Sequence, residues 1–501
     1  MPTRITVSLI YLGVLVLFAF LARRRTQSIE DYYVGGRSVP AALVALSFYA
    51  TFVSTNSFIG HSAKSFVFGV SWMIVGVVLV ALTVFSWLVI APRFRDKAES
   101  LGSIVPSDLF RLHFRSPRAG ALAGLIIMFD SIFFLAAVFL GASEAMAALL
   151  GFPFGLSLAI IFVVQIAYTS VGGYLADVWS DSIQGIVLFV GAIALPVALV
   201  AGAGGFENVV TTLRSIDDAR LAADGDTFSL MRFTTAAPLI LITGIGLSGG
   251  LKLVADPRQL SRFYGLRDAA SARRGTLLIV VMVAVTYFFL LPIGLLARVY
   301  DIPAELTART DGIVPWLLAD AAVVGPLLGA VILTALLAAA MSTIDSVLLV
   351  AGAALQRDVL PLVLPRRTPC EAGVRSARRI VVLFAILPLG LALLASQHVR
   401  LGLGIVELTV FAGALYASAF LPGLMGILFW KRASTTGAVL GMVGGGLSTA
   451  LWRFVAMPLS DGLARFPEVF VGLVIGAGAF ALGSLLRPDK APSDGVTDGG
   501  L

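Results

Sequence analysis

The sequence contains very few of the residues that build metal centres and disulfide frameworks. Its 501 residues include one cysteine, Cys370, and three histidines, His61, His113 and His398. A single cysteine cannot close an intramolecular disulfide or ligate a zinc or iron–sulfur cluster, and three scattered histidines do not suggest a transition-metal centre. Because the sequence also has no metal-ligand cluster and no phosphate-binding loop, it does not indicate an enzyme.

Charged side chains are scarce as well. Only 13% of the residues are charged and 58% are hydrophobic, whereas about a quarter of the residues of a soluble domain are charged. With a mean hydropathy of +0.96, the chain is predicted to be a polytopic membrane protein. The net charge of +7 comes from arginines spread through several loops, and no basic helix interleaved with aromatic residues suggests binding to nucleic acid.

Long apolar runs make up most of the chain. A helix needs about 20 apolar residues to cross about 30 Å of hydrocarbon, and this criterion predicts about thirteen spans. We therefore expect one all-α transmembrane domain over residues 1–486 and a disordered tail over 487–501. The predicted spans are 4–22, 40–66, 70–92, 119–149, 153–171, 177–203, 233–253, 275–298, 321–352, 378–396, 403–430, 434–456 and 468–486.

The basic residues predict the orientation of these spans. Arginine and lysine concentrate in the loops after odd-numbered spans, for example 93–118 and 357–379, whereas the loop over 204–232 carries more acidic than basic residues. Loops rich in arginine and lysine face the cytoplasm. The chain is therefore expected in the cell inner membrane, with its amino terminus outside and its carboxyl terminus in the cytoplasm.

Polar side chains interrupt the ninth span. Residues 339–346 read Ala-Ala-Met-Ser-Thr-Ile-Asp-Ser, and on a helix Ser342, Asp345 and Ser346 share one face. Polar and ionisable groups at membrane depth usually line a pathway or bind something, so a cation site is expected here. The alternative for each hydroxyl alone is a bond back to a carbonyl of its own helix.

Two spans are predicted to be broken helices. The second places five polar residues, 51 and 54–57, at mid-membrane, and the seventh carries the glycine-rich run 244–250, then Lys252 and Asp256-Pro257. Interrupted helices five spans apart are typical of an inverted repeat, whose helix ends coordinate ion and substrate at the midplane. The alternative for the seventh span is close helix packing, since Gly246 and Gly250 have the spacing of a packing motif.

Several motifs in this order resemble the sodium:solute symporter family, whose members have the LeuT-type five-plus-five inverted repeat. The resemblance covers about residues 28–430 and implies an inverted-repeat core over about 40–430, with 4–22, 434–456 and 468–486 as peripheral helices. The motifs are DYYVGGR at 31–37, the 50–60 run ending SFIG, YTSVGG at 168–173, DVWSDSIQ at 177–184, RQLSR at 258–262 followed by Arg267 and Asp268, and MSTIDS at 341–346 followed by QRD at 356–358.

The resemblance also implies sodium sites. The family's principal site would use backbone carbonyls of Ala50, Val53 and Ala339 with the hydroxyls of Ser342 and Thr343, an all-oxygen set that suits a hard monovalent cation.

A second sodium site, found in some members, would combine Ser342 with the set Asp181, Asp345 and Ser346. Asp345 stands where such a site has a hydroxyl, so it could strengthen the site, bind a proton or pair with a base. The alternative for Asp181 is an ion pair with a loop arginine.

The solute site is expected around the two broken helices. Lysines at membrane depth are costly unless paired or hydrated, so Lys64 or Lys252 could hold a carboxylate, the latter beside backbone dipoles at the glycine-rich break. The alternatives are snorkelling for Lys64 and an ion pair with Asp130, Glu144 or Asp256 for Lys252. The predicted solute-binding residues are Ser54, Thr55, Asn56, Ser57, Lys64, Gly249 and Lys252.

These features predict a sodium-coupled secondary active symporter that imports a small organic solute by alternating access. The wording of residues 54–60 looks more like the carboxylate and pantothenate branch of the family than the sugar branch, so a carboxylate is the expected solute. An amino acid or sugar solute, proton coupling through Asp345 or Asp181, and a transporter-like sensor module are the alternatives. The expected partners are the solute, sodium ions and the lipid bilayer.

Overall fold

The computed structural model describes residues 28–489, apart from 38, 225–228, 234–238, 309, 320–323, 364–372 and 398–404, together with scattered residues between 6 and 21. The predicted span 4–22 therefore lies largely outside the described residues, and so does most of the predicted tail over 487–501. Everything described is helix, turn or irregular backbone apart from one isolated bridge between Val39 and Leu266. The all-α prediction is confirmed.

Ten helical stretches in the described residues are long and apolar enough to cross a membrane, and Ala41–Phe52 and Phe154–Ala167 are shorter apolar helices. The count of thirteen spans is not confirmed. The long helix α9 covers two predicted spans, 153–171 and 177–203, whereas the predicted span 40–66 is divided between separate helices. Gly173, with φ +65° and ψ −168°, divides the long helix α9, and a backbone of this kind is open to glycine because glycine has no Cβ.

The helices of the first half run from α2 to α10. Their bounds are α2 Ile29–Val34, α3 Ala41–Phe52, η2 Asn56–Gly60, α4 His61–Phe68, η3 Gly69–Trp72, α5 Met73–Phe85, η4 Ser86–Ile90, α6 Ala91–Leu101, α7 Pro106–His113, α8 Pro117–Leu150, α9 Phe154–Gly202 and α10 Phe206–Asp224.

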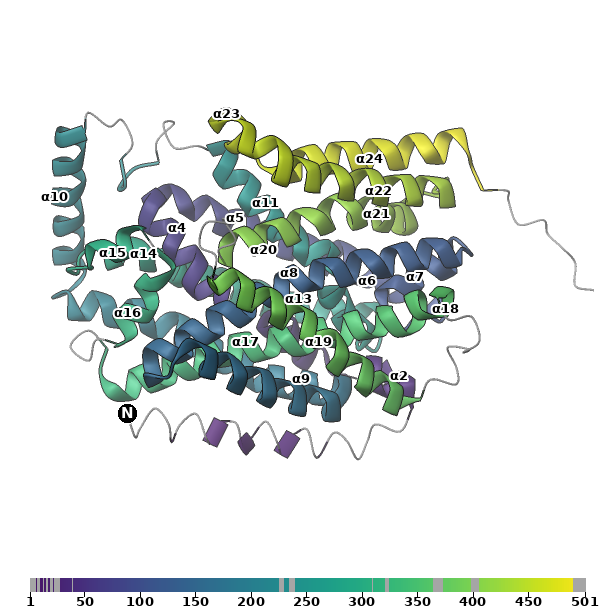
Figure 1. The fold of residues 1–501 in the computed structure, drawn as a ribbon, viewed down its shortest axis with the longest axis horizontal. Coiled ribbons are helices and arrows are strands. Elements are labelled where there is room, and N and C mark those ends of the chain that lie inside the picture. The colour runs from purple at the N-terminus through teal and green to yellow at the C-terminus, as the bar shows by residue number, and fades with distance from the viewer. Residues whose placement is uncertain are drawn as a thin grey trace, which may run out of the picture.

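The helices of the second half run from α11 to α21, and the last helices pack against one another at the edge of the bundle (Figure 1). Their bounds are α11 Leu239–Ala255, α12 Pro257–Tyr264, α13 Ala269–Leu290, α14 Ile293–Ala297, α15 Ala304–Ala308, α16 Ile313–Ala319, α17 Pro326–Ala354, η6 Leu355–Val359, α18 Leu360–Val363, α19 Val374–Gln397, α20 Ile405–Leu415, η8 Tyr416–Phe420, α21 Leu421–Phe429, α22 Thr435–Leu451, α23 Asp461–Ala464 and α24 Glu468–Leu486.

Loops that the sequence predicts on opposite sides of the membrane lie at opposite ends of the bundle. In Figure 1, α10 and α14 to α16 gather at the left end, whereas α2, α7 and α18 lie toward the right end. The left end includes α10, from the loop with more acidic than basic residues, and the right end includes α7 and α18, from the two basic loops. Which of these ends faces the cytoplasm stays a prediction from the basic loops.

The helix break in the second span lies where the polar residues predicted it. α3 ends at Phe52, Val53 is extended with ψ 100°, and helix resumes at Thr55–Asn56. Ser54 and Ser57 are buried at this break, so the interrupted backbone is enclosed by protein, as irregular backbone at membrane depth must be.

The break in the seventh span lies further along than predicted. α11 continues as helix through Gly249, Gly250 and Lys252 to Ala255, and the break falls at Asp256. Proline at position 257 explains this, because it disfavours helical geometry in the preceding residue and is well tolerated as the first residue of the next helix. The expectation of exposed backbone dipoles at Gly249 and Gly250 was wrong.

The glycines of α11 instead allow close packing on α5, which was the alternative for this span. A Cβ at Gly250 would lie 2.5 Å from Leu82, and one at Gly246 would lie 3.5 Å from Val75 and Val78.

Candidate functional site

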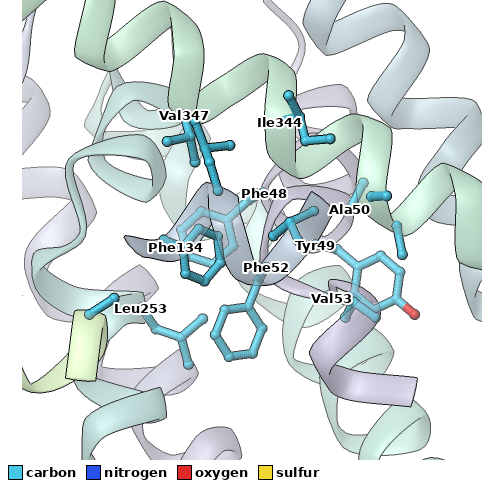
Figure 2. Close-up of a cluster of buried hydrophobic side chains, with 14 of the residues drawn as sticks. Phe48, Tyr49, Ala50, Phe52, Val53, Phe134, Leu253, Ile344 and Val347 are labelled. Atoms are coloured by element: carbon cyan, nitrogen blue, oxygen red, sulfur yellow. The ribbon is translucent and has the colours of Figure 1, made fainter. Parts of the chain in front are cut away.

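The end of α3 meets the middle of α17 at the centre of the bundle. α17 is buried along nearly its whole length, so its hydroxyl groups face protein. Figure 2 shows Ala50 of α3 on the side of Ile344 of α17, Val53 just beyond the end of α3, and Phe52 near Leu253 of α11. The predicted sodium ligands therefore come from two elements that the fold does bring together.

Two hydroxyls of α17 point at the carbonyls where α3 ends. Ser342 Oγ donates to the carbonyl of Ala50 at 2.9 Å and lies 3.3 Å from the carbonyl of Ala339. Thr343 Oγ1 donates to the carbonyl of Thr51 at 3.3 Å. The Thr51 carbonyl is an additional oxygen at this place that the sequence prediction did not include.

This arrangement consists of neutral oxygens. Carbonyl oxygens keep free lone pairs, and a hydroxyl can turn its proton away and offer a lone pair instead. The Ser342 and Thr343 side chains are fully buried, so a cation held there would be shielded from water. An oxygen set without a formal charge suits reversible binding of a hard monovalent cation.

A cluster with ionisable side chains lies one helical turn away, around Arg262 of α12. The guanidinium donates to Asp177 at 2.5 Å and lies 3.0 Å from Asp181. It also donates to Thr51 Oγ1 at 3.0 Å and to the hydroxyl of Ser346. All of these side chains are buried, so α3, α9, α12 and α17 are joined by one arginine.

This pairing bears on the second sodium site. Asp181 contacts Arg262, Ser47 and Thr51, which is the ion-pair alternative, although the arginine belongs to a helix and not to a loop.

Asp345 has different neighbours. Its carboxylate accepts from Gln165 and Thr169 in the first half of α9, and its second oxygen has no hydrogen-bond partner in the described residues.

The structure therefore divides the four residues of the second site into three groups: Asp181 and Ser346 share Arg262 and Thr51, whereas Ser342 and Asp345 each have other partners. Adjacent positions on a helix point about 100° apart, so Ser346 can contact Arg262 while Asp345 contacts Gln165 and Thr169 of α9. A second sodium site remains a prediction. Asp177 and Asp181 share the guanidinium of Arg262, whereas the buried Asp345 forms no ion pair within the described residues. A buried carboxylate without a charged partner favours a cation nearby.

Lys252 lies in a second buried charged region, between α8, α11 and α20. Its ammonium sits 3.9 Å from the centroid of the Phe134 ring, and its Cε packs against Gly413. No hydrogen-bond acceptor in the described residues reaches its Nζ atom, although the residue is 2% exposed.

None of the three expected partners, Asp130, Glu144 and Asp256, accepts a hydrogen bond from Lys252 in the described residues. Asp256 accepts from Arg258 at 2.7 Å, and Asp130 has one carboxylate oxygen with no partner in the described part of the chain. A small cavity of about 10 Å³ lies in this region, which is room for about one water molecule. Its lining residues are Asp130, Ser131, Phe134, Asp256, Arg258, Val347, Val350 and Tyr416.

The polar residues at the break of the second span have unsatisfied groups. The Thr55 hydroxyl and the Asn56 carbonyl oxygen lack hydrogen-bond partners in the described residues. Ser57 shares a hydrogen bond of 3.0 Å with the Tyr287 hydroxyl. Free donors and acceptors of this kind could serve a small polar solute.

Lys64 lies apart from this region. It pairs with Glu407 of α20 at 3.2 Å, and both side chains are partly exposed. It is therefore held across two helices, and neither carboxylate binding nor simple snorkelling is needed to satisfy its charge.

Sequence reasoning missed several residues of these clusters. Phe134 and Tyr416 carry no signal in an apolar span, and their roles depend on contacts between distant helices. Gln165 and Thr169 do carry one, because they stand four residues apart in an apolar helix and hence on one face.

Comparison with known proteins agrees with this geometry. The model of the sodium:solute symporter family matches residues 32–445. The chain belongs to the sodium:solute symporter family. The high-affinity proline transporter PutP of Bacillus subtilis is 27% identical over 97% of this chain and 98% of that protein. The sodium/pantothenate symporter of Escherichia coli is 26% identical over 93% of this chain and 92% of that protein.

Solved structures show the same fold. A substrate-bound, outward-open Na⁺-coupled sialic acid symporter matches 97% of this chain and 98% of its own with a TM-score of 0.77 and 22% identity. Mhp1, a nucleobase-cation-symport-1 family transporter, matches 91% of this chain and 95% of its own with a TM-score of 0.53 and 16% identity. The protein is a multi-pass membrane symporter with a LeuT-type fold, it couples a small solute to sodium, and it is not an enzyme.

Proposed function

We propose that this symporter imports a small organic carboxylate, with Lys252 binding the carboxylate and sodium binding at Ala50, Val53, Ala339, Ser342 and Thr343. The ammonium of Lys252, buried without a hydrogen-bond acceptor in the described residues, is the observation that carries the proposal. An unpaired buried charge costs several kcal/mol, and a bound carboxylate would remove that cost. Proline, pantothenate and sialic acid, the solutes of the relatives, each contain a carboxylate.

The position of Lys252 supports this role. It lies on α11, one turn before the break at Asp256, and Arg258 just beyond that break donates to the carbonyl of Thr51 at 3.2 Å. The two broken helices therefore meet beside both proposed sites. Solute and sodium would stabilise the same closed arrangement, which is the basis of coupling.

We propose that the basic loops lie on the cytoplasmic side of the inner membrane. A negative interior then drives sodium inward with about 2.3 kcal/mol per charge per 100 mV, before the concentration term. No chemical step on the solute is required.

Thermal stabilisation of the purified protein tests the proposal. The panel consists of monocarboxylates, pantothenate, amino acids including proline, sugars and sialic acid, each in sodium and in potassium. A ligand that binds the folded state stabilises it by mass action, and a carboxylate effective only in sodium is the expected result. Stabilisation by a sugar without a carboxylate would overturn the anion proposal and leave the family assignment intact.

Lys252→Met tests the proposed binding of the solute carboxylate, and Lys64→Met is its matched control. Lys252→Met should lose the response to carboxylates and keep the response to sodium. Lys64→Met removes a lysine that already pairs with Glu407 and should keep both responses. If Lys252→Met binds the carboxylate as tightly as the wild type does, the assignment of Lys252 is wrong.

A further inference from the structure

A basic cavity opens between α6, α7 and the end of α21, away from the transport sites. Its volume is about 670 Å³, which is within the range of small-molecule pockets. Its lining residues are Arg93, Asp96, Lys97, Ser100, His113, Ile427, Leu428, Phe429, Trp430 and Lys431. Three permanent cations face one carboxylate, so the cavity carries a positive charge.

The cations of this cavity have no carboxylate partner in the described residues. Within the part of the chain that the structure describes, Arg93, Lys97 and Lys431 form no ion pair, whereas neighbouring Arg95 pairs with Glu99 and Arg111 pairs with Asp358. The contrast indicates that the charges of the cavity are free to bind an external anion.

The pKa of His113 is lowered in this cavity. Burial and then the nearby charge of Lys97 lower the pKa of His113 to about 4. The histidine is therefore neutral at physiological pH, and the positive charge of the cavity comes from its arginine and lysines.

Exposed apolar side chains lie on the helix that leads into α6 and at the end of α21, where Phe429 lines the cavity. Phe85 and Leu88 are 37% and 47% exposed on the helix that continues into α6, and Phe429 is 47% exposed. Arg93 stacks over the Phe429 ring at 5.0 Å and donates to the carbonyl of Val89 at 3.1 Å. The guanidinium is thus held where an apolar face ends and a polar cavity begins.

We propose that this cavity binds the phosphate headgroup of an anionic phospholipid, with its acyl chains along Phe85, Leu88 and Phe429. Arginine and lysine are suited to a phosphate group, and basic pockets between membrane helices on the cytoplasmic side bind such headgroups. Free phosphate shares the headgroup chemistry, but it would not use the apolar face. The tryptophan at 430 fits the same boundary, since tryptophan prefers the level of the headgroups.

Titration of the purified protein with a short-chain lipid tests this site. Dioctanoyl-phosphatidylglycerol, the zwitterionic phosphatidylcholine analogue and inorganic phosphate are compared by the shift in unfolding temperature. Phosphatidylglycerol should stabilise at lower concentration than the other two. Equal stabilisation by inorganic phosphate or by phosphatidylcholine would overturn the assignment to an anionic lipid.

Charge-neutralised variants locate the binding. Each basic residue near an anionic surface contributes about a factor of five, so Lys97→Gln with Lys431→Gln should weaken phosphatidylglycerol binding about 30-fold. The control, Arg118→Gln with Arg273→Gln, removes two exposed charges that do not line the cavity and should leave binding within about twofold. Equal loss in both pairs, or no loss in the first, contradicts the proposal.

Fluorescence quenching gives a readout that does not depend on these variants. The emission of Trp430 is obtained as the difference between the wild type and Trp430→Phe. In vesicles of brominated phosphatidylglycerol this emission should be quenched more strongly than in vesicles of brominated phosphatidylcholine. The same quenching in both lipids would show that the cavity does not select an anionic headgroup.

Discussion

Two clusters of polar groups lie one helical turn apart on α17, and they differ in formal charge. Around Ser342 and Thr343 the ligands are hydroxyls and carbonyls without formal charge. Around Ser346 a fixed guanidinium pairs with two carboxylates. We propose that the first cluster binds and releases sodium, whereas in the second cluster the guanidinium of Arg262 contacts side chains of three other helices and cannot leave.

One residue connects the proposed sodium site with the arginine cluster. Thr51 belongs to both clusters, because its carbonyl accepts from Thr343 and its hydroxyl accepts from Arg262. A cation that moves the end of α3 therefore also disturbs the arginine cluster. We expect sodium binding and the packing of α12 to be linked through this residue.

The largest effect is expected for Arg262→Met, which removes the fixed cation. Breaking a buried ion pair costs about 3–5 kcal/mol because charges remain unpaired, so the unfolding temperature should fall sharply. Thermal unfolding in detergent measures this. Combining the change with Asp177→Asn should recover part of the loss, and an unchanged unfolding temperature in Arg262→Met would show that the cluster does not lock the helices.

Matched serine variants on α17 separate the two clusters. Ser342→Ala removes a proposed sodium ligand worth about 1–2 kcal/mol, so the sodium concentration for half-maximal transport should rise about tenfold. Ser346→Ala should leave that concentration nearly unchanged and lower stability instead. Uptake at varied sodium concentration tests both. The same sodium dependence in the two variants would remove the distinction.

Lys252→Met is expected to have opposite effects on solute binding and folding. Removing an unpaired buried charge should leave the unfolding temperature unchanged or raise it. Losing a charged hydrogen bond should weaken carboxylate binding by about 2–3 kcal/mol. Unfolding and ligand titration on one sample measure both. A lower unfolding temperature with intact binding would mean that the lysine is structural.

The smallest effect is expected for the partly exposed pair of Lys64 and Glu407. Exposed ion pairs contribute about 0–1 kcal/mol, so Glu407→Gln should change the unfolding temperature little. Comparison with Arg262→Met under the same conditions sharpens the contrast between an exposed and a buried pair. A fall in unfolding temperature as large as that of Arg262→Met would show that the pair of Lys64 and Glu407 stabilises the helix packing as strongly as the buried cluster does.

Much of the site could be predicted from the sequence. Hydroxyls and a carboxylate within an apolar helix are costly, so the run at 342–346 carries a strong local signal. The same is true of the polar residues 54–57, and the break in the second span lies there. The family follows from motifs whose order extends over most of the chain.

Long-range contacts could not be predicted in this way. Arg262 and Asp177 lie in different helices and pair only in the folded bundle, and helical periodicity carries no information about such partners. The break of the seventh span was misplaced because the glycines at 249 and 250 were weighted over Pro257. Those glycines pack against α5, and the proline sets the break.

A sodium titration of the purified protein without solute tests the central claim most directly. The unfolding temperature is followed in sodium and in potassium for the wild type and for Ser342→Ala combined with Thr343→Ala. Because a bound ion stabilises the folded state by mass action, sodium alone should raise the unfolding temperature of the wild type, and the double variant should not respond. A double variant that keeps the full response to sodium would contradict the placement of the sodium site.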